Sequence, residues 1–335
     1  MTKPSPAEGD RLAIHPPRRT WCAPAPVLAV LLLGAGSAWA QTQQQYNATI
    51  GIQETATNNV ELVGADQRES DFITQITPVL SAKLTGAHSL LDAYVSLPIL
   101  IYARTGAENN SILPTVNLLG DLNGFERTLH LEGAVNISQQ FFTPFGAQPQ
   151  DLASATNNRY RTSIYRISPY YHNVTGDGVE YELRNNNTWS TLSGAPVDTS
   201  NSFTTEFLAK AETTGDRLVG WSASYDYTDT KFKNQDTGIV TQLARVSPYY
   251  SVDPQFRVNV SAGWEENRYI LSSSNDVIYG LGFRWRPTER TNVLGNWEHR
   301  FFGSSYNFSF DHRTPLSVWS IQASRNITTY PQQVA

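Results

Sequence analysis

Sulfur-containing residues are almost missing from this sequence. Its 335 residues include one cysteine, Cys22, and one methionine, Met1, and both lie within the first 40 residues. The rest of the chain therefore has no thiol that could form a disulfide or ligate a metal. Long apolar runs are also missing after residue 40, since none reaches the roughly 20 residues that a membrane-spanning helix requires.

The first 40 residues have the organisation of a secretory signal. Arg11, Arg18 and Arg19 form a positively charged start, Val27–Leu33 is an apolar run too short to span a bilayer, and Ala38–Ala40 has the small-x-small pattern of a cleavage site. We expect residues 1–40 to be removed after Ala40 and residues 41–335 to form the exported domain. A twin-arginine reading of the start is the alternative. Because Cys22 precedes the apolar run, we do not expect it to be a lipid anchor.

The exported domain is acidic. Residues 1–40 hold four of the 25 basic and two of the 30 acidic residues, which leaves 21 and 28 and a net charge of −7. This balance argues against nucleic acid as a partner. The mean hydropathy of the chain, −0.37, fits a secreted soluble protein and an outer-membrane β-barrel equally, since half of each barrel strand faces water.

Apolar and polar residues alternate with a period of two along most of the domain. In one such segment Val219, Trp221, Ala223, Tyr225 and Tyr227 alternate with Gly220, Ser222, Ser224, Asp226 and Thr228. Alternate residues of a strand point to opposite faces, so each segment predicts a strand with one apolar and one polar face. Turn-forming Gly, Asp, Asn and Pro residues separate these segments. The pattern predicts about fifteen strands, near residues 46–56, 71–84, 88–103, 112–122, 126–140, 158–172, 178–191, 202–213, 217–232, 239–251, 255–271, 276–286, 289–302, 304–312 and 316–328.

The predicted fold is therefore all-β, a transmembrane antiparallel up-and-down β-barrel of about 14–16 strands. A soluble sandwich or solenoid also alternates, but its core would hold small aliphatic residues instead of the aromatic residues seen on nearly every apolar face. The residues expected to face the barrel lumen are Glu132, Asp226, Arg257, Arg284, Arg286, Glu298 and Arg300. The residues expected in an aromatic belt at the membrane interface are Tyr170, Tyr171, Tyr249, Tyr250, Trp264 and Trp285.

One motif occurs twice. Arg166–Tyr171 and Arg245–Tyr250 share the pattern Arg-x-Ser-Pro-Tyr-Tyr, and each is followed within a few residues by a turn. Proline followed by paired tyrosines fits a strand that leaves a membrane through its aromatic belt, although proline ends strands in any β protein. Two segments that are poor in regular pattern, 143–158 and 193–201, are expected to be extracellular loops.

Catalytic and metal-binding motifs do not stand out. The histidines after residue 40 have no serine two positions away on the same strand face, and His130 shares a face with Glu132 in what we interpret as a structural pair. Asp226 with Asp229, and Glu265 with Glu266, could bind Ca²⁺ but are typical of solvated turns. We therefore expect no enzymatic activity, no cofactor and no metal site.

Several segments resemble a known family. Ile50–Leu62, Glu69–Pro78, Asn136–Gln140 and Pro144–Gln148, together with both Ser-Pro-Tyr-Tyr segments, are similar to the outer-membrane β-barrel proteins associated with PEP-CTERM/exosortase systems, which are encoded beside exopolysaccharide genes in Gram-negative bacteria. The resemblance covers residues 46–330. It implies an outer-membrane barrel that works in exopolysaccharide export or surface display, with outer-membrane lipid, the barrel-assembly machinery and exopolysaccharide or its export proteins as partners. The family offers no catalytic or binding residues that could be carried over.

The C-terminal end departs from that family. Its members continue with more strands past the point that matches residues 328–333, whereas Pro331 and Ala335 make a poor closing strand. Fifteen strands is also an odd number, and bacterial single-chain barrels use even numbers. We expect that one strand is misassigned or that the barrel is incomplete at its C-terminus. Three roles remain open: a porin-like pore or scaffold, a surface protein that binds through its loops, and an outer-membrane hydrolase.

Overall fold

The computed structural model describes residues 43–124, 127–194, 201–233, 238–270 and 272–326. The predicted signal segment, its cleavage site after Ala40 and the last nine residues lie outside this part of the chain, as does most of the predicted loop at 193–201. The strands are β1 (Gln43–Thr57), β2 (Asp71–Thr85), β3 (Ser89–Ser96), β4 (Ile99–Tyr102), β5 (Ser111–Ile112), β6 (Thr115–Gly124), β7 (Leu129–Phe141), β8 (Arg159–Val174), β9 (Val179–Ser193), β10 (Ser202–Thr213), β11 (Val219–Phe232), β12 (Ile239–Ser251), β13 (Phe256–Arg268), β14 (Ser273–Thr288), β15 (Thr291–Arg300), β16 (Gly303–Arg313) and β17 (Val318–Arg325).

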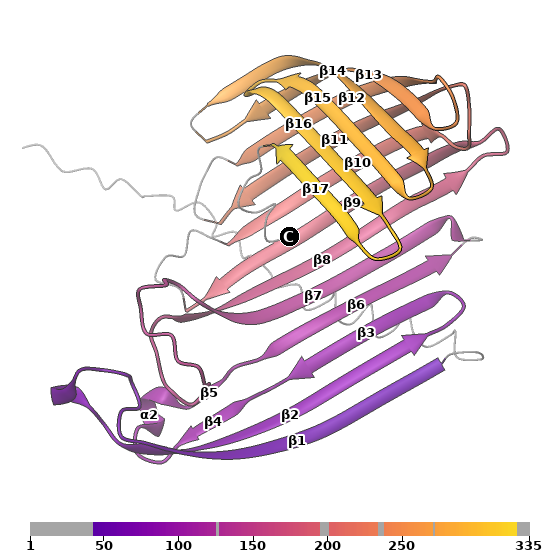
Figure 1. The fold of residues 1–335 in the computed structure, drawn as a ribbon. Coiled ribbons are helices and arrows are strands. Elements are labelled where there is room, and N and C mark those ends of the chain that lie inside the picture. Colours follow the sequence, from indigo (N-terminus) through magenta and orange to yellow (C-terminus); the bar gives the residue numbers. More distant parts are fainter. Residues whose placement is uncertain (1–42, 125–126, 195–200, 234–237, 271, 327–335) are drawn as a thin grey trace, which may run out of the picture.

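These strands form one strongly curved antiparallel sheet in up-and-down order, which Figure 1 shows running from β1 in indigo to β17 in yellow. Neighbouring strands of the sheet are paired, from β1 with β2 at one edge to β16 with β17 at the other, and β6 to β16 each pair with the next strand in the chain. The predicted antiparallel up-and-down barrel fold is confirmed. Among the described residues, β1 and β17 are not paired with each other.

Two strand positions are broken by proline. β3 and β4 both pair with β2, and they are separated at Leu97-Pro98. β5 and β6 pair with β4 and β3 respectively, and they are separated at Leu113-Pro114. Proline has no N–H to donate to a ladder, so it interrupts a strand at this point. The seventeen strands therefore occupy fifteen positions, which are the fifteen that the sequence predicts, two of them divided.

Helices contribute little. A 3-10 turn, η3 (Ala65–Gln67), lies between β1 and β2, and one turn of helix, α2 (Gly106–Asn109), follows β4. Within the described ranges, no helix has both the length and the apolar character needed to cross a membrane.

The connections distinguish the two ends of the sheet. At one end, which we call the turn end, short turns join the strands, for example 175–178 between β8 and β9 and 252–255 between β12 and β13. At the other, the loop end, longer segments such as 58–70, 103–110 and 142–158 join the strands of the N-terminal half, while β15 and β16 are joined by residues 301–302 alone. Short turns on one side and long loops on the other are the pattern of bacterial outer-membrane barrels.

The sheet has an apolar and a polar face. On β14 the apolar residues point outward and are largely exposed: Val277 is 66% exposed, Tyr279 52%, Leu281 62% and Trp285 46%. The alternate residues of β14, including Gly280, Gly282 and Arg284, point to the concave side. Such a continuous exposed apolar surface is unfavourable in water and suits a hydrocarbon environment.

Candidate functional site

The concave side of β7–β16 carries the charged residues, and we call this surface the polar face. Six of the seven residues expected to face the lumen have regular positions on it. Glu132 lies opposite Ser168, Asp226 opposite Leu243, Arg257 opposite Arg284, and Glu298 opposite Gly280, while Arg300 reaches the Glu265 carboxylate from the loop end of β15. The seventh, Arg286, lies where the register of β14 and β15 shifts, and its Nε donates to Asn292 at 3.4 Å.

Two of the six expected belt residues are on the wrong face. Tyr170 stacks on His130 with a ring-centroid distance of 4.4 Å, and Tyr249 shares a 3.1 Å hydrogen bond with Thr213, so both lie on the polar face. Neighbouring strand residues must point to opposite faces, so paired tyrosines cannot both lie in a belt. The other four, Tyr171, Tyr250, Trp264 and Trp285, point to the apolar outer face of the sheet, as their positions in the alternation require.

Three arginines on the polar face form ion pairs that pass over one or two intervening strands. Arg184 of β9 contacts Glu132 of β7 at 2.7 Å, passing over β8. Arg245 of β12 contacts Glu298 of β15 at 2.7 Å, passing over β13 and β14. Side chains on non-adjacent strands approach each other on the concave side of a curved sheet and diverge on the convex side. The pairs therefore identify the polar face as the interior.

The third ion pair, between Arg300 of β15 and Glu265 of β13, is the most buried. Glu265 is 1% exposed, and its Oε2 accepts hydrogen bonds from Arg300 Nη2 at 2.6 Å and Nε at 3.1 Å. Its Oε1 accepts from the backbone N–H of Phe301 at 2.8 Å. A desolvated carboxylate is stable only when its oxygens are this fully bonded.

Small residues make space for these side chains. A Cβ added to Gly280 would lie 2.6 Å from both Glu298 Cγ and Ser261 Oγ. Real Cβ atoms do not approach other atoms so closely, so the Arg245–Glu298 pair depends on glycine at the position beneath it.

The repeated Arg-x-Ser-Pro-Tyr-Tyr motif places one tyrosine–arginine stack on each of two strands. The Arg184 guanidinium carbon lies 3.8 Å from the Tyr170 ring centroid, and the Arg257 guanidinium carbon lies 4.0 Å from that of Tyr249. In both cases the arginine comes from the following strand, and the stack lies near the turn end. A guanidinium over an aromatic face is attracted by the ring quadrupole.

Sequence reasoning did not include Arg184, Arg245 and Glu265 among its lumen residues. The period-two alternation of β9, β12 and β13 places each of them on the polar face, and extending it to these strands would have found them. It would not have found their partners, which are 35 to 53 residues away in sequence.

The residue pairs that the sequence suggests for His130 and for the neighbouring carboxylates take other partners or point to opposite faces. His130 Nδ1 lies 3.7 Å from Asp121 Oδ2, while Glu132 binds Arg184. Asp226 and Asp229 point to opposite faces, as do Glu265 and Glu266, because one member of each pair has odd and the other even position in its strand.

A second structured region lies at the loop end, where three connections pack together. Tyr102 Oη donates to the carbonyl of Ala153 at 2.8 Å, and the N–H of Ala155 donates to the carbonyl of Val60 at 2.9 Å. These contacts enclose a small apolar core of Val60, Ile73, Leu100, Tyr102 and Ala153. The predicted loop at 143–158 is thus held in place and not extended into solvent.

Asp71, the first residue of β2, fastens this loop cluster at its edge through contacts with Arg104 and Thr105 of the 103–110 loop. Burial alone would raise the pKa of its carboxyl. Hydrogen bonds from the hydroxyl and N–H of Thr105 and from the N–H groups of Arg104 and Phe72 outweigh burial and lower the pKa to about 2.

Comparisons with known proteins found only distantly similar structures. A scan against protein-family models found no match, and a search of curated proteins found none. Among solved structures, a loop L8 deletion mutant of OmpT, an outer membrane protein of Vibrio cholerae, is similar with a TM-score of 0.37 and 9% sequence identity over 81% of this chain and 97% of that chain. The in-vitro folded trimer form of OmpT from the same organism gives 0.35 and 8% over 86% and 95%. Likeness this distant says nothing about what the chain binds.

Proposed function

We propose that this chain is an outer-membrane β-barrel that conducts or holds hydrated solutes along its polar face and catalyses no reaction. The two-sided sheet carries the proposal: exposed apolar residues such as Leu281 cover the outside, and charged residues such as Arg257 cover the concave side. A sheet of this kind leaves hydrocarbon on one side and water on the other. In this proposal the barrel is inserted into the outer membrane by the barrel-assembly machinery, and outer-membrane lipid surrounds its apolar face.

The resemblance of residues 46–330 to barrels encoded beside exopolysaccharide genes suggests the context. We propose that the solute belongs to exopolysaccharide export or to exosortase-linked surface processes. Deleting the gene in its host and weighing the secreted polysaccharide tests this: reduced secretion supports the export role, and unchanged secretion removes it.

Membrane insertion can be tested residue by residue, because replacing Cys22 by serine leaves a chain without cysteine. Val260→Cys and Asn259→Cys introduce single labels at adjacent positions on opposite faces of β13. In lipid vesicles, a fluorophore at position 260 should be quenched by doxyl-lipid and one at 259 by aqueous iodide. Equal quenching of both labels by iodide would refute insertion.

Conduction is then measured in planar bilayers. Stepwise currents support a pore. Silent bilayers that contain correctly inserted protein support a scaffold.

A surface-binding role is the second candidate, and the packed loop end favours it. The loops enclose a cavity of about 450 Å³ that is lined by tyrosine, arginine and amide side chains, including Tyr160, Arg159 and Asn110. Its volume lies in the range of small-molecule sites, and its tyrosine, arginine and amide groups can form hydrogen bonds with a small hydrated ligand. Binding of secreted polysaccharide by a silent barrel, abolished by Tyr160→Ala, would favour this role over transport.

A further inference from the structure

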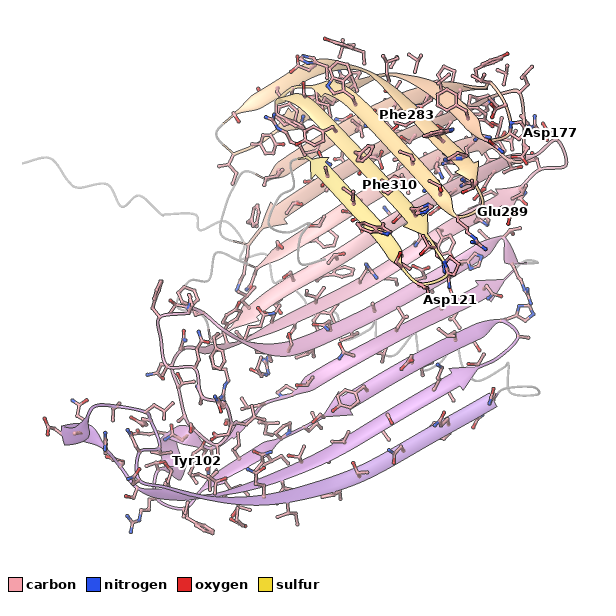
Figure 2. All side chains as sticks on the ribbon, viewed as in Figure 1. Tyr102, Asp121, Asp177, Phe283, Glu289 and Phe310 are labelled. Carbon is pink, nitrogen blue, oxygen red and sulfur yellow. The ribbon has the colours of Figure 1, made fainter. Side chains whose placement is uncertain are left out.

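The polar face contains a cavity at the turn end, between β9 and β16, with a volume of about 790 Å³. Figure 2 shows the side chains of these strands, with Asp177 and Glu289 marking turns at this end. Four basic side chains line the cavity: Lys210, Arg245, Arg257 and Arg284. Their partners determine whether the cavity has free positive charge.

Most of the acidic side chains in the lining already have a partner. Glu212 binds Lys210 at 2.7 Å, Glu298 binds Arg245 at 2.7 Å, and Glu180 lies 3.0 Å from His172. The remaining acidic lining residue, Asp216, lies on the exposed turn that follows β10.

Arg257 and Arg284 keep their charges uncompensated. They are directly opposite each other on β13 and β14, and within the described part of the chain neither has an ion-pair partner. Arg257 stacks on Tyr249, and its Nε donates to the hydroxyl of Ser251 at 3.2 Å, which orients the guanidinium without neutralising it. Arg286 adds a third positive charge that repels Arg284, and the Glu212 charge that attracts Arg284 is shared with Lys210.

Like charges placed opposite each other on adjacent strands destabilise a sheet unless something neutralises them. A guanidinium fork matches the planar oxygens of a carboxylate or phosphate and binds them with two parallel hydrogen bonds. We propose that Arg257 and Arg284, supported by Arg286, form a binding site for an oxyanion group of a hydrated solute at the turn-end mouth of the barrel. This inference rests on the proposed function, because it names the class of solute that the polar face accepts.

The test uses the full chain folded in detergent and measures binding by calorimetry with D-glucuronate, inorganic phosphate and neutral D-glucose as probes. The wild type should bind at least one of the two anions and show no binding of glucose. Glucuronate alone would identify a carboxylate-bearing sugar as the solute, and phosphate alone would identify a phosphorylated one. Equal binding of glucose and glucuronate would overturn the proposal.

The decisive variant is Arg257→Gln with Arg284→Gln, in which anion affinity should fall at least about tenfold. The control is Lys83→Gln, which removes an interior-facing positive charge from β2, outside the cavity, and should bind anions as the wild type does. If the double variant does not fold, Arg257→Lys with Arg284→Lys keeps the charge but removes the forked geometry, and its affinity should also fall. Unchanged affinity in a folded double variant would refute the site.

Conductance separates this proposal from the function on which it rests. Anion binding without currents would retain the site and remove the pore. Currents without anion preference or binding would retain the pore and remove the site.

Discussion

The two Arg-x-Ser-Pro-Tyr-Tyr segments have the same local structure, but the arginine stacked on the tyrosine is neutralised by carboxylates in one and not in the other. Tyr170 and Tyr249 both lie on the polar face beneath an arginine of the next strand. Arg184, above Tyr170, donates to Glu132 at 2.7 Å and to Glu182 at 2.8 Å, whereas Arg257, above Tyr249, has no carboxylate partner among the described residues. The motif sets the position of the tyrosine, and the neighbouring strands decide whether the arginine charge is available to a ligand.

The largest loss of folding stability should come from breaking the most buried ion pair, in which a carboxylate neutralises the arginine. Glu265→Ala leaves Arg300 without its carboxylate, and an uncompensated buried charge costs about 3–5 kcal/mol of folding free energy. Urea unfolding of the protein in lipid vesicles measures the change. The control is Glu266→Ala on the outer face, where the 3.2 Å pair with Arg268 is exposed and contributes about 0–1 kcal/mol. A comparable loss in both variants would show that burial does not set the strength of these pairs.

A smaller loss of folding stability is expected when a methyl group fills the space beneath the Arg245–Glu298 pair. Gly280→Ala puts a methyl group 2.6 Å from Glu298 Cγ and should cost about 1–3 kcal/mol through overpacking. Gly51→Ala is the matched substitution on β1, where the nearest atom to the new Cβ would be Thr77 O at 3.9 Å. The same unfolding measurement should find Gly51→Ala close to the wild type. Tolerance of both substitutions would mean that the ion pair can move without loss.

Much of this fold follows from the alternation of residues, and particular misses show where that information ends. The predicted strands 202–213 and 239–251 coincide with β10 and β12, and each is followed in the sequence by turn-forming residues, Thr214–Asp216 and Asp253-Pro254. The breaks at Pro98 and Pro114 were missed, although proline in a central strand is itself a signal. The belt prediction is wrong for Tyr170 and Tyr249 because it treats each tyrosine pair as a unit, whereas neighbouring residues of a strand point to opposite faces. The pairing of Arg184 with Glu132 could not be read from the sequence, since it depends on the curvature of the sheet.

The carboxylate of Asp71 should make the loop end sensitive to acid. Its pKa is about 2 in the folded chain, below the usual value of 3.8, so the ionised form is bound more tightly in the folded state. The stabilisation is complete well above pH 3.8 and is lost as the pH falls from there through 2. Limited proteolysis of the 103–110 loop should therefore accelerate over that range in the wild type. In Asp71→Asn, cleavage should be faster at pH 7 and should depend little on pH, and a wild-type profile in this variant would rule out the carboxylate as the cause.

The smallest and most direct change turns one stack into the other. Glu132→Gln with Glu182→Gln keeps the size of both side chains but removes the two negative charges that neutralise Arg184. If free arginine charge is what makes an oxyanion site, the Tyr170 stack of this variant should gain weak anion binding. Calorimetry with phosphate should show it even when Arg257 and Arg284 are both replaced by glutamine, so that the turn-end cavity cannot contribute. Because amides still accept hydrogen bonds from Arg184, the guanidinium keeps its orientation, and only its charge is released. Absence of the gain would mean that the anion site requires the paired arginines of β13 and β14, and that a single stacked guanidinium is not enough.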